Sequence, residues 1–272
     1  MLSIITPVYN GEQFIEFCLK NVIEQDCPNI EHIIVDGGST DKTVEIIKQY
    51  AELYPHIRWI SEKDRGQSDA MNKGILMAKG EIIAVLNDDD FYEPNVLNSV
   101  SIIFKILPEP SFVVGNCNIW GDEGKIVKVN KPKHLKFIDL VSMIHPFPVN
   151  PSAYFYHRSL HQRVGLYEVE DHYTMDLDFI LKAVQEASVY YIDETWGNYR
   201  NIQGTKTISS QGNIKSKGNY KMLIRKHRKK LNNLQQLQAI IGELILYRIR
   251  YFTEYPHDII PSIKRKLIKA NY

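Results

Sequence analysis

The sequence "IIAVLNDDD", residues 82–90, runs from apolar residues through Asn87 into Asp88, Asp89 and Asp90. Neighbouring carboxylates repel each other, and each raises the pKa of the next unless a positive charge compensates. Mg²⁺ or Mn²⁺ would supply that charge, and either ion binds one or two carboxylates together with phosphate oxygens. A solvated loop tip is the competing interpretation, so the elements around the cluster must decide between the two.

The segments before this cluster alternate between short apolar runs and amphipathic stretches. Strands are predicted over 2–8, 33–35, 57–62 and 81–86, and helices over 12–25, 42–54 and 67–80. Apolar strands that alternate with amphipathic helices are typical of a parallel sheet covered on both faces. Ser39, Thr40 and Asp41 are helix-capping residue types, and they are predicted to lead into the second helix.

Polar residues follow each of these strands, at 6–10, 36–39, 62–66 and 87–90. Ligands bind beyond the carboxyl ends of strands in such sheets, so the polar segments are predicted to converge on one binding rim. The loop "TPVYNGEQ" after the first strand has neither a G-x-G-x-x-G nor a GK[ST] motif, which argues against a dinucleotide dehydrogenase or a P-loop enzyme. The phosphates of a nucleotide would need another neutralising group, and a cation on the aspartates would serve.

The later segments are less regular. A helix is predicted over 94–107, a possible hairpin over 111–130, a strand and short helix over 152–168, a helix over 175–187 and a strand over 188–193. From about 211 onward the pattern is helical and basic. We therefore expect a catalytic domain over 1–210, with a nucleotide-binding half (1–95) and an acceptor-side half (96–210), followed by a basic helical tail over 211–272.

The composition limits the class of protein. The 272 residues are 44% hydrophobic and 24% charged with a net charge of +1, which argues against a protein that coats nucleic acid. Cys18, Cys27 and Cys117 have no metal-ligand spacing and fit a reducing compartment. The N-terminus lacks signal-peptide features, and no apolar stretch reaches the roughly 18 residues of a spanning helix. These features predict a cytoplasmic protein.

Five segments in this order resemble the family 2 glycosyltransferases: "ITPVYN", "IIVDGGSTDKT", "EKDRGQSDAMNKG", "GEIIAVLNDDD" and "YTMDLDFILK". The resemblance covers roughly residues 1–205. It implies an α/β, Rossmann-like GT-A fold whose mostly parallel sheet is flanked by helices, here with a C-terminal helical extension. It also implies a nucleotide-sugar donor, here a UDP-sugar, and inversion of the anomeric centre.

The resemblance assigns site residues by motif. It implies donor contacts for Thr6, Pro7, Tyr9, Asp36, Asp64, Asp69, Asn72, Asn87 and Asp88. Thr6, Pro7 and Tyr9 would surround the nucleobase and ribose, and Asp36 would accept the N3–H of uracil. The metal motif of the family is D-x-D; Asn87 takes its first position here, and Asp89, at its last position, is the expected ligand of Mn²⁺ or Mg²⁺.

The acidic pair of the family precedes an amphipathic helix, as Asp176 and Asp178 do here. Asp176 matches the general base that takes the acceptor proton, a role worth about 10²–10⁴ in rate. Asp178 is expected to support the site, and both acids would also stabilise a helix N-terminus. Arg200 and Lys206 are expected to close over the diphosphate, and Lys73 either contacts phosphate or is solvated.

Histidines His145, His157 and His161 match no metal motif and are interpreted as structural or acceptor-lining. The basic tail has two interpretations: contact with anionic lipid, which suits a lipid-linked acceptor, or packing on the body or a second subunit as a homodimer. The expected acceptor is a glycan or lipid-linked hydroxyl in bacterial surface polysaccharide synthesis, which places the protein in the cytoplasm or at the inner face of the cell membrane. The alternative functions are a nucleotidyltransferase and an inactive nucleotide-sugar-binding protein.

Overall fold

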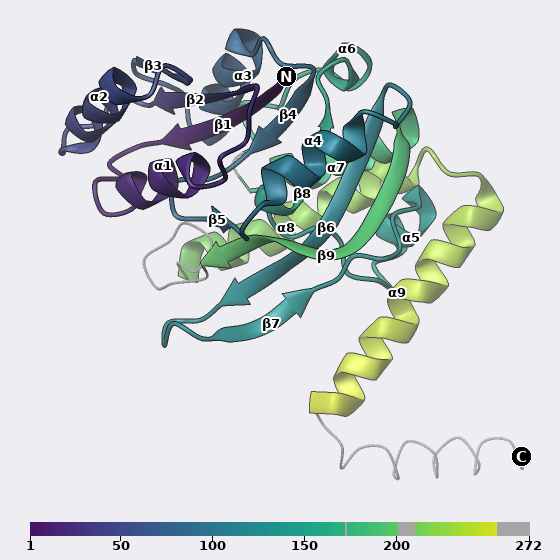
Figure 1. The fold of residues 1–272 in the computed structure, drawn as a ribbon. Coiled ribbons are helices and arrows are strands. Elements are labelled where there is room, and N and C mark those ends of the chain that lie inside the picture. The colour runs from purple at the N-terminus through teal and green to yellow at the C-terminus, as the bar shows by residue number, and fades with distance from the viewer. Residues whose placement is uncertain (172, 201–209, 255–272) are drawn as a thin grey trace, which may run out of the picture.

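The computed structural model describes residues 1–171, 173–200 and 210–254 (Figure 1). One nine-stranded mixed sheet runs in the order β3-β2-β1-β4-β8-β6-β9-β5, and β7 pairs with β6. Helices cover both faces of the sheet, so the predicted α/β fold is confirmed. Buried apolar residues of α1, α2 and α4 pack on one face, and those of α3, α5, α7 and α8 pack on the other.

The first half is a parallel sheet, as predicted. Its strands are β1 (Leu2–Val8), β2 (Ile30–Asp36), β3 (Ile57–Ser61) and β4 (Ile82–Val85), and its helices are α1 (Ile15–Ile23), α2 (Thr43–Leu53) and α3 (Gln67–Met77). Val8 pairs with Asp36, and Asp36 pairs with Ser61. The carboxyl ends of β1, β2 and β3 are therefore level at one rim of the sheet, and β4 ends lower, where Val85 pairs with Ile5.

The predicted cap of α2 is only partly right. The Asp41 carboxylate accepts the backbone N–H of Thr43 at 3.0 Å and so caps the helix. The Ser39 hydroxyl instead donates to Asp36 and accepts the backbone N–H of Asn10 at 2.7 Å. Ser39 therefore joins the loops after β1 and β2, because these loops lie side by side above the ends of paired strands.

The second half adds antiparallel pairings. Its elements are β5 (Phe91–Tyr92), α4 (Val96–Phe104), β6 (Ser111–Trp120), β7 (Ile126–Asn130), α5 (Phe137–Ser142), a 3₁₀ turn (Pro151–Ala153), β8 (Tyr154–His157), α6 (Leu160–Val164), α7 (Met175–Glu186) and β9 (Ser188–Arg200). β8 lies between β4 and β6 and is antiparallel to both. The predicted hairpin is present as the antiparallel pair β6–β7. β9 is longer than predicted because its parallel pairing with β6 continues through two register shifts to Arg200.

The tail contains α8 (Ser210–Arg228) and α9 (Asn233–Glu254). Leu223 and Ile224 of α8 are buried in the same core cluster as α7. The buried His227 side chain contacts the Asp178 carboxylate, with 2.7 Å between Nε2 and Oδ1. This part of the tail therefore packs on the body. Among the residues described, no helix has both the length and the apolar character to cross a membrane.

Replacing Asp178 tests how α8 is held. Burial alone would raise the pKa of Asp178, but the hydrogen bonds from His227 and Lys182 outweigh it and lower the pKa to about 2. Asp178→Asn leaves the buried His227 without its carboxylate, and we expect it to lower the free energy of unfolding by about 3 kcal/mol at pH 7. Urea denaturation gives that difference. Glu45→Gln, an exposed acid in the first turn of α2, is the control and should cost less than about 1 kcal/mol.

The same contact has a defined pH dependence. A carboxylate whose pKa is depressed on folding stabilises the protein above the unfolded value of 3.8 and loses this contribution as the pH falls toward about 2. The stability difference between wild type and Asp178→Asn should therefore shrink across that window. A difference that stays constant from pH 5 to pH 2 would contradict the assigned contact.

Candidate active site

The loops that follow the first four strands meet at the rim. A Cβ placed on Gly37 would lie 2.5 Å from Oδ2 of Asp64, so the loops after β2 and β3 are in contact. A Cβ on Gly11 would lie 2.3 Å from Oδ2 of Asp88, so the loops after β1 and β4 are in contact as well. Only glycine leaves room for these carboxylates, and the rim brings Asp64 and Asp88 against neighbouring backbone.

The Asp36 carboxylate organises the loop after β2. It is buried and accepts the backbone N–H groups of Gly38 and Ser39 at 3.0 Å each and the Ser61 hydroxyl at 2.7 Å. The Ser39 hydroxyl donates to its other oxygen, Oδ1. Three of these four donors share Oδ2, whereas Oδ1 accepts only the Ser39 hydroxyl among the described contacts, which leaves one of its two lone pairs. The predicted contact with uracil stays a prediction for that oxygen.

The first motif is split between the core and solvent. Thr6 is fully buried, and its hydroxyl lies 2.9 Å from Nε2 of His32, whose pKa burial lowers to about 3. Pro7 is buried opposite Val35 in the sheet. The Tyr9 side chain is 63% exposed beside the rim. Of the three predicted nucleoside contacts, Tyr9 has the side chain that is open to a ligand.

The third motif mainly supports the surrounding loops. The Asn72 amide is buried, donates to the Tyr167 carbonyl at 2.8 Å and accepts the Tyr167 N–H at 2.9 Å. The Asp69 carboxylate accepts the Arg65 N–H at 3.2 Å and lies 3.6 Å from the Lys73 ammonium. Asn72 is thus turned toward the segment before α7 and away from the rim, and Asp69 is occupied within its own loop and helix.

The aspartate cluster combines partly exposed and buried carboxylates. Burial, followed by the charge of Asp89, raises the pKa of Asp88 to about 7 and that of Asp90 to about 8. Burial also raises the pKa of Asp89, and the Arg200 guanidinium opposes this shift. Asp88 and Asp89 are partly exposed, whereas Asp90 is fully buried. The cluster therefore carries more carboxylate than its surroundings neutralise.

Asp90 joins three parts of the sheet. It accepts the side-chain amides of Asn87 at 2.9 Å and Asn150 at 2.7 Å and the backbone N–H of Arg200 at 3.2 Å. Asn150 was not predicted as a site residue. Its signal in the sequence is the Asn-Pro pair before Ser152, whose backbone N–H its side chain accepts at 2.8 Å, but the contact with Asp90 depends on a fold that brings distant segments together.

Arg200 ends β9 beside the cluster. Its guanidinium lies over the rings of Phe17 at 4.4 Å and Phe91 at 5.1 Å, measured to the ring centroids. These contacts hold the cation near Asp89. Lys206, the other predicted phosphate contact, lies outside the described residues.

Asp176 and Asp178 start α7 and point to different partners. The Tyr154 hydroxyl of β8 donates to Oδ1 of Asp176 at 3.2 Å, while Asp178 contacts Lys182 and His227. Asp171 holds the turn before this helix by accepting the N–H of Thr174 at 2.9 Å. Since β8 pairs directly with β4, the hydrogen bond connects Asp176 to the strand next to the one that carries the aspartate cluster.

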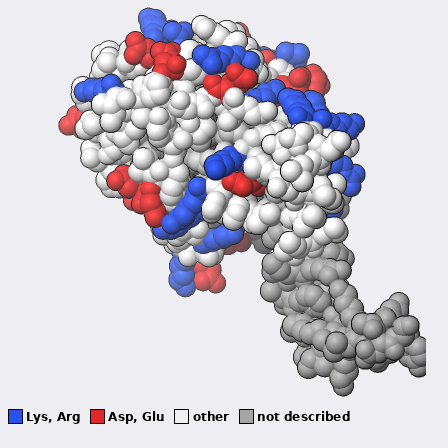
Figure 2. All heavy atoms as spheres, turned by 90° about the vertical axis from the view of Figure 1, so that its right-hand side faces the viewer, with Lys and Arg blue, Asp and Glu red and all other residues white. Residues whose placement is uncertain are grey.

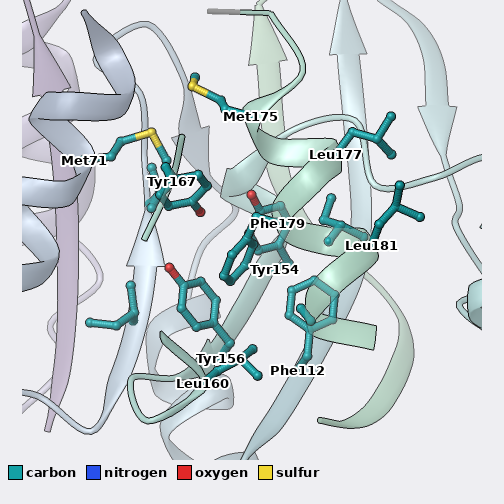
Figure 3. Close-up of a cluster of buried hydrophobic side chains, with 14 of the residues drawn as sticks. Met71, Phe112, Tyr154, Tyr156, Leu160, Tyr167, Met175, Leu177, Phe179 and Leu181 are labelled. Atoms are coloured by element: carbon teal, nitrogen blue, oxygen red, sulfur yellow. The ribbon is translucent and has the colours of Figure 1, made fainter. Parts of the chain in front are cut away.

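A group of buried tyrosines, Tyr154, Tyr156 and Tyr167, lies in the core beside α7 (Figure 3). The His161 ring donates through Nδ1 to the Gly165 carbonyl at 2.9 Å, since a carbonyl can only accept, and Nε2 then accepts the Tyr156 hydroxyl at 3.0 Å. Burial, followed by the neighbouring Tyr154 hydroxyl, raises the pKa of Tyr167 well above its usual value. These neutral hydroxyls form the wall that positions Tyr154.

The three histidines considered from the sequence lie in structural contacts. His157 accepts the Ser111 N–H at 3.0 Å, His161 belongs to the tyrosine wall, and His145 stacks on His134 with 3.7 Å between ring centroids.

A cavity of about 380 Å³ lies at the other end of β9. Its lining is Lys133, Leu135, Lys136, Val184, Val189 and Tyr191, and it includes none of the rim aspartates.

Solved structures of other proteins share the fold of this chain. Residues 1–349 of Staphylococcus aureus TarS, in complex with UDP-GlcNAc, superpose with a TM-score of 0.69 at 17% identity over 89% of this chain and 71% of that one. The mannosyltransferase PcManGT of Pyrobaculum calidifontis, in complex with GDP-Man and Mn²⁺, gives a TM-score of 0.55 at 18% identity over 99% of this chain and 85% of that one. These likenesses establish the fold, which is that of the GT-A glycosyltransferases.

The chain belongs to glycosyl transferase family 2, whose sequence profile matches residues 3–160. An uncharacterized glycosyltransferase of Rickettsia typhi, RT0329, is 28% identical over 219 residues, which cover 78% of this chain and 68% of that protein. The uncharacterized glycosyltransferase YibD of Escherichia coli is 37% identical over 117 residues, 43% of this chain and 33% of that protein. The chain thus covers a third of YibD and about two thirds of RT0329.

Tyr154→Phe tests the contact that positions Asp176. The substitution removes one hydroxyl and keeps the ring in the core, so we expect a loss of about 10-fold in kcat, the lower end for a hydrogen bond to a charged group. The affinity for the donor nucleotide should be unchanged, which calorimetry can check. Tyr191→Phe is the control, because its hydroxyl also makes two hydrogen bonds, to Asn116 and Asp193, but lies away from the rim. An equal loss in both variants would contradict a role at Asp176.

Proposed function

We propose that this glycosyltransferase moves a sugar from a UDP-sugar to a hydroxyl of a glycan or lipid-linked acceptor, with inversion at the anomeric carbon. The observation that carries the proposal is that two acidic groups are linked to adjacent strands of the sheet. Asp88 and Asp89 follow β4, and Asp176 is held by Tyr154 of β8, which is antiparallel to β4. One group would face the leaving diphosphate and the other the attacking hydroxyl.

The donor half of the site would comprise residues 1–95. The exposed Tyr9 ring would stack on the nucleobase, and Oδ1 of Asp36, although that side chain is buried, is the oxygen that would accept its N–H. The segment 96–210 would supply the acceptor side, with the tail over 211–272 as a separate element. Both solved relatives in complex carry nucleotide sugars, UDP-GlcNAc in TarS and GDP-Man in PcManGT, which supports a donor of this class.

A divalent cation fits the aspartate cluster. Among the described residues no three His, Cys, Asp or Glu side chains form a preorganised metal cage. Mg²⁺ and Mn²⁺ do not require one, because they bind one or two carboxylates and complete their shell with phosphate oxygens and water. Asp89, with Asp88 beside it, would hold the ion, and the PcManGT complex contains Mn²⁺. The bound cation would neutralise charge on the leaving diphosphate.

In the reaction, the acceptor oxygen forms a bond to the anomeric carbon on the face opposite the diphosphate. The carbon–oxygen bond to the diphosphate breaks, and the hydroxyl proton passes to Asp176, which acts as the general base. The Arg200 guanidinium, held on Phe17 and Phe91, would contact the departing diphosphate. The setting we propose is surface polysaccharide synthesis at the cytoplasmic face of a bacterial membrane.

The two alternative functions fit less well. A nucleotidyltransferase needs a glycine- and basic-rich loop after the first strand, and this chain has "TPVYNGEQ" there. A protein that only binds nucleotide sugars has no use for a general base. The hydrogen bond from Tyr154 to Asp176 supports the catalytic alternative, because it holds a carboxylate that could serve as that base.

Asp89→Asn tests the cation site. UDP with Mn²⁺ at 100 times its Kd should stabilise the wild type by about 2.7 kcal/mol, and the variant should lose most of this gain. Thermal shifts with UDP, GDP, CDP and dTDP, each with and without Mn²⁺, would also identify the nucleotide. Asp26→Asn, an exposed residue with positive φ in the turn after α1, is the control. Stabilisation that does not depend on metal would contradict the proposed cation.

Cation binding should also depend on pH. With the pKa of Asp88 raised to about 7 and that of Asp90 to about 8, the empty cluster holds protons that a cation displaces. The affinity for Mn²⁺ in the presence of UDP should therefore rise between pH 6 and pH 8. Calorimetry in buffers of different ionisation enthalpy would count the released protons, and zero release would contradict this mechanism.

Asp176→Asn tests the base. The amide cannot accept the proton, so we expect kcat to fall by at least about 10²-fold while the Kd for UDP changes less than two-fold. Glu186→Gln, an exposed acid at the other end of α7, should retain full activity. Loss of nucleotide binding together with activity would place Asp176 in the donor site and contradict its assignment as the base.

A further inference from the structure

The exposed face of α8 is basic. Along the last turns of the helix and the turn that follows, pairs of exposed residues alternate with pairs of buried ones. The exposed charged side chains are Lys221, Arg225, Lys226, Lys229 and Lys230. No aspartate or glutamate occurs over residues 195–242, so nothing in the sequence of this segment offsets these cations. We call them the basic face.

The first part of α9 presents an apolar face. Leu234, Leu237, Ile240, Ile241, Leu244 and Ile245 are between 46% and 67% exposed. Their spacing of three and four residues places them along one side of the helix. On the opposite side Ala239 is fully buried, and a Cβ on Gly242 would lie 2.6 Å from the Ile144 side chain. The helix therefore uses one side to pack on the body, and no described residue covers the apolar other side.

The two faces are held in a fixed relation. The buried Arg228 at the end of α8 donates to the Val141 carbonyl at 2.8 Å and pairs with Glu243 of α9. Glu243 is the one acidic residue over 233–245. Its contact with Arg228 directs its side chain away from the apolar face. Figure 2 shows Lys and Arg side chains bordering an uncharged surface on the side of the molecule where α9 lies.

We propose that the basic face of α8 and the apolar face of α9 together form a docking surface for an anionic lipid membrane. Clustered Lys and Arg side chains near such a surface each contribute about 1 kcal/mol of attraction. Leu and Ile on an adjacent helix face enter the boundary between headgroups and acyl chains, as in helices that lie in the membrane plane. Neither helix crosses the bilayer in this arrangement.

A second copy of the chain fits this surface less well. Pairing two apolar faces around a two-fold axis would bring identical basic faces toward each other, and like charges would repel. The exposed stretch of α9 also lacks the charged flanking residues that select a helical partner. Anionic lipid complements both the charge and the apolar character of the surface.

This inference deepens the proposed function, since it places the enzyme where a lipid-linked acceptor is found, but it is tested by binding alone. The full chain is sedimented with vesicles of phosphatidylcholine that contain 30% phosphatidylglycerol, and with phosphatidylcholine alone, in each case without donor or acceptor. One variant combines Arg225→Gln, Lys226→Gln and Lys229→Gln. A second combines Leu237→Gln and Leu244→Gln, which keep good helix formers. The control combines Ile102→Gln, Lys105→Gln and Ile106→Gln, an equally exposed mixed patch at the end of α4.

We expect the wild type and control to bind the anionic vesicles, and the basic variant to lose on the order of 100-fold in partition coefficient, together with its salt dependence. The apolar variant should lose binding to both kinds of vesicle. Vesicle binding at the wild-type level by either variant would overturn the proposal, and so would an absence of vesicle binding by the full chain. Light scattering offers a further test. A wild-type dimer that the combined Leu237→Gln and Leu244→Gln variant dissociates, while that variant still binds vesicles, would also overturn the proposal. Asp176→Asn should bind as the wild type does, so loss of catalysis and loss of docking are distinguishable.

Discussion

The buried carboxylate of Asp90 is the constraint on which the rim depends. Burial and the charge of Asp89 raise its pKa to about 8, and three donors from three segments converge on it and oppose that rise: Asn87 after β4, Asn150 before β8, and the backbone of Arg200 at the end of β9. An unpaired charge at this position would be prohibitive. The network therefore fixes the ends of a parallel half and a mixed half of the sheet in one place.

The hydrogen bonds to Asp90 explain how three neighbouring aspartates can be accommodated in a folded protein. Asp90 is turned inward and bonds to the framework, whereas Asp88 and Asp89 are partly exposed, where the proposed cation would bind. Arg200 has both functions: its backbone satisfies Asp90, and its guanidinium lies on aromatic rings near Asp89. Three adjacent aspartates that look equivalent in the sequence therefore differ in role. Asp90 is structural, whereas Asp88 and Asp89 are the proposed ligand contacts.

The parallel half of the sheet was predictable because its strands and helices alternate along the chain, and the carboxyl ends of parallel strands coincide wherever their register is level. The second half depends on pairings between distant segments, such as Ala84 with Phe155, for which local patterns give no signal. Side-chain direction was also out of reach. Thr6 and Asn72 belong to the predicted motifs, yet one bonds to His32 in the core and the other to the Tyr167 backbone. Their partners are chosen by packing between elements, which the motif alone does not specify.

The helix α7 carries two acids that face in different directions: Asp176 toward Tyr154 of the sheet, and Asp178 toward His227 of α8. If α8 and α9 rest on a membrane as proposed, the base and the resting surface belong to one rigid body, because one turn of one helix joins them. The height of the base above the lipid is then a constant of the fold. Such an enzyme would select its acceptor by distance. It would glycosylate hydroxyl groups at one height above the bilayer and would not react with chemically identical groups nearer or farther away.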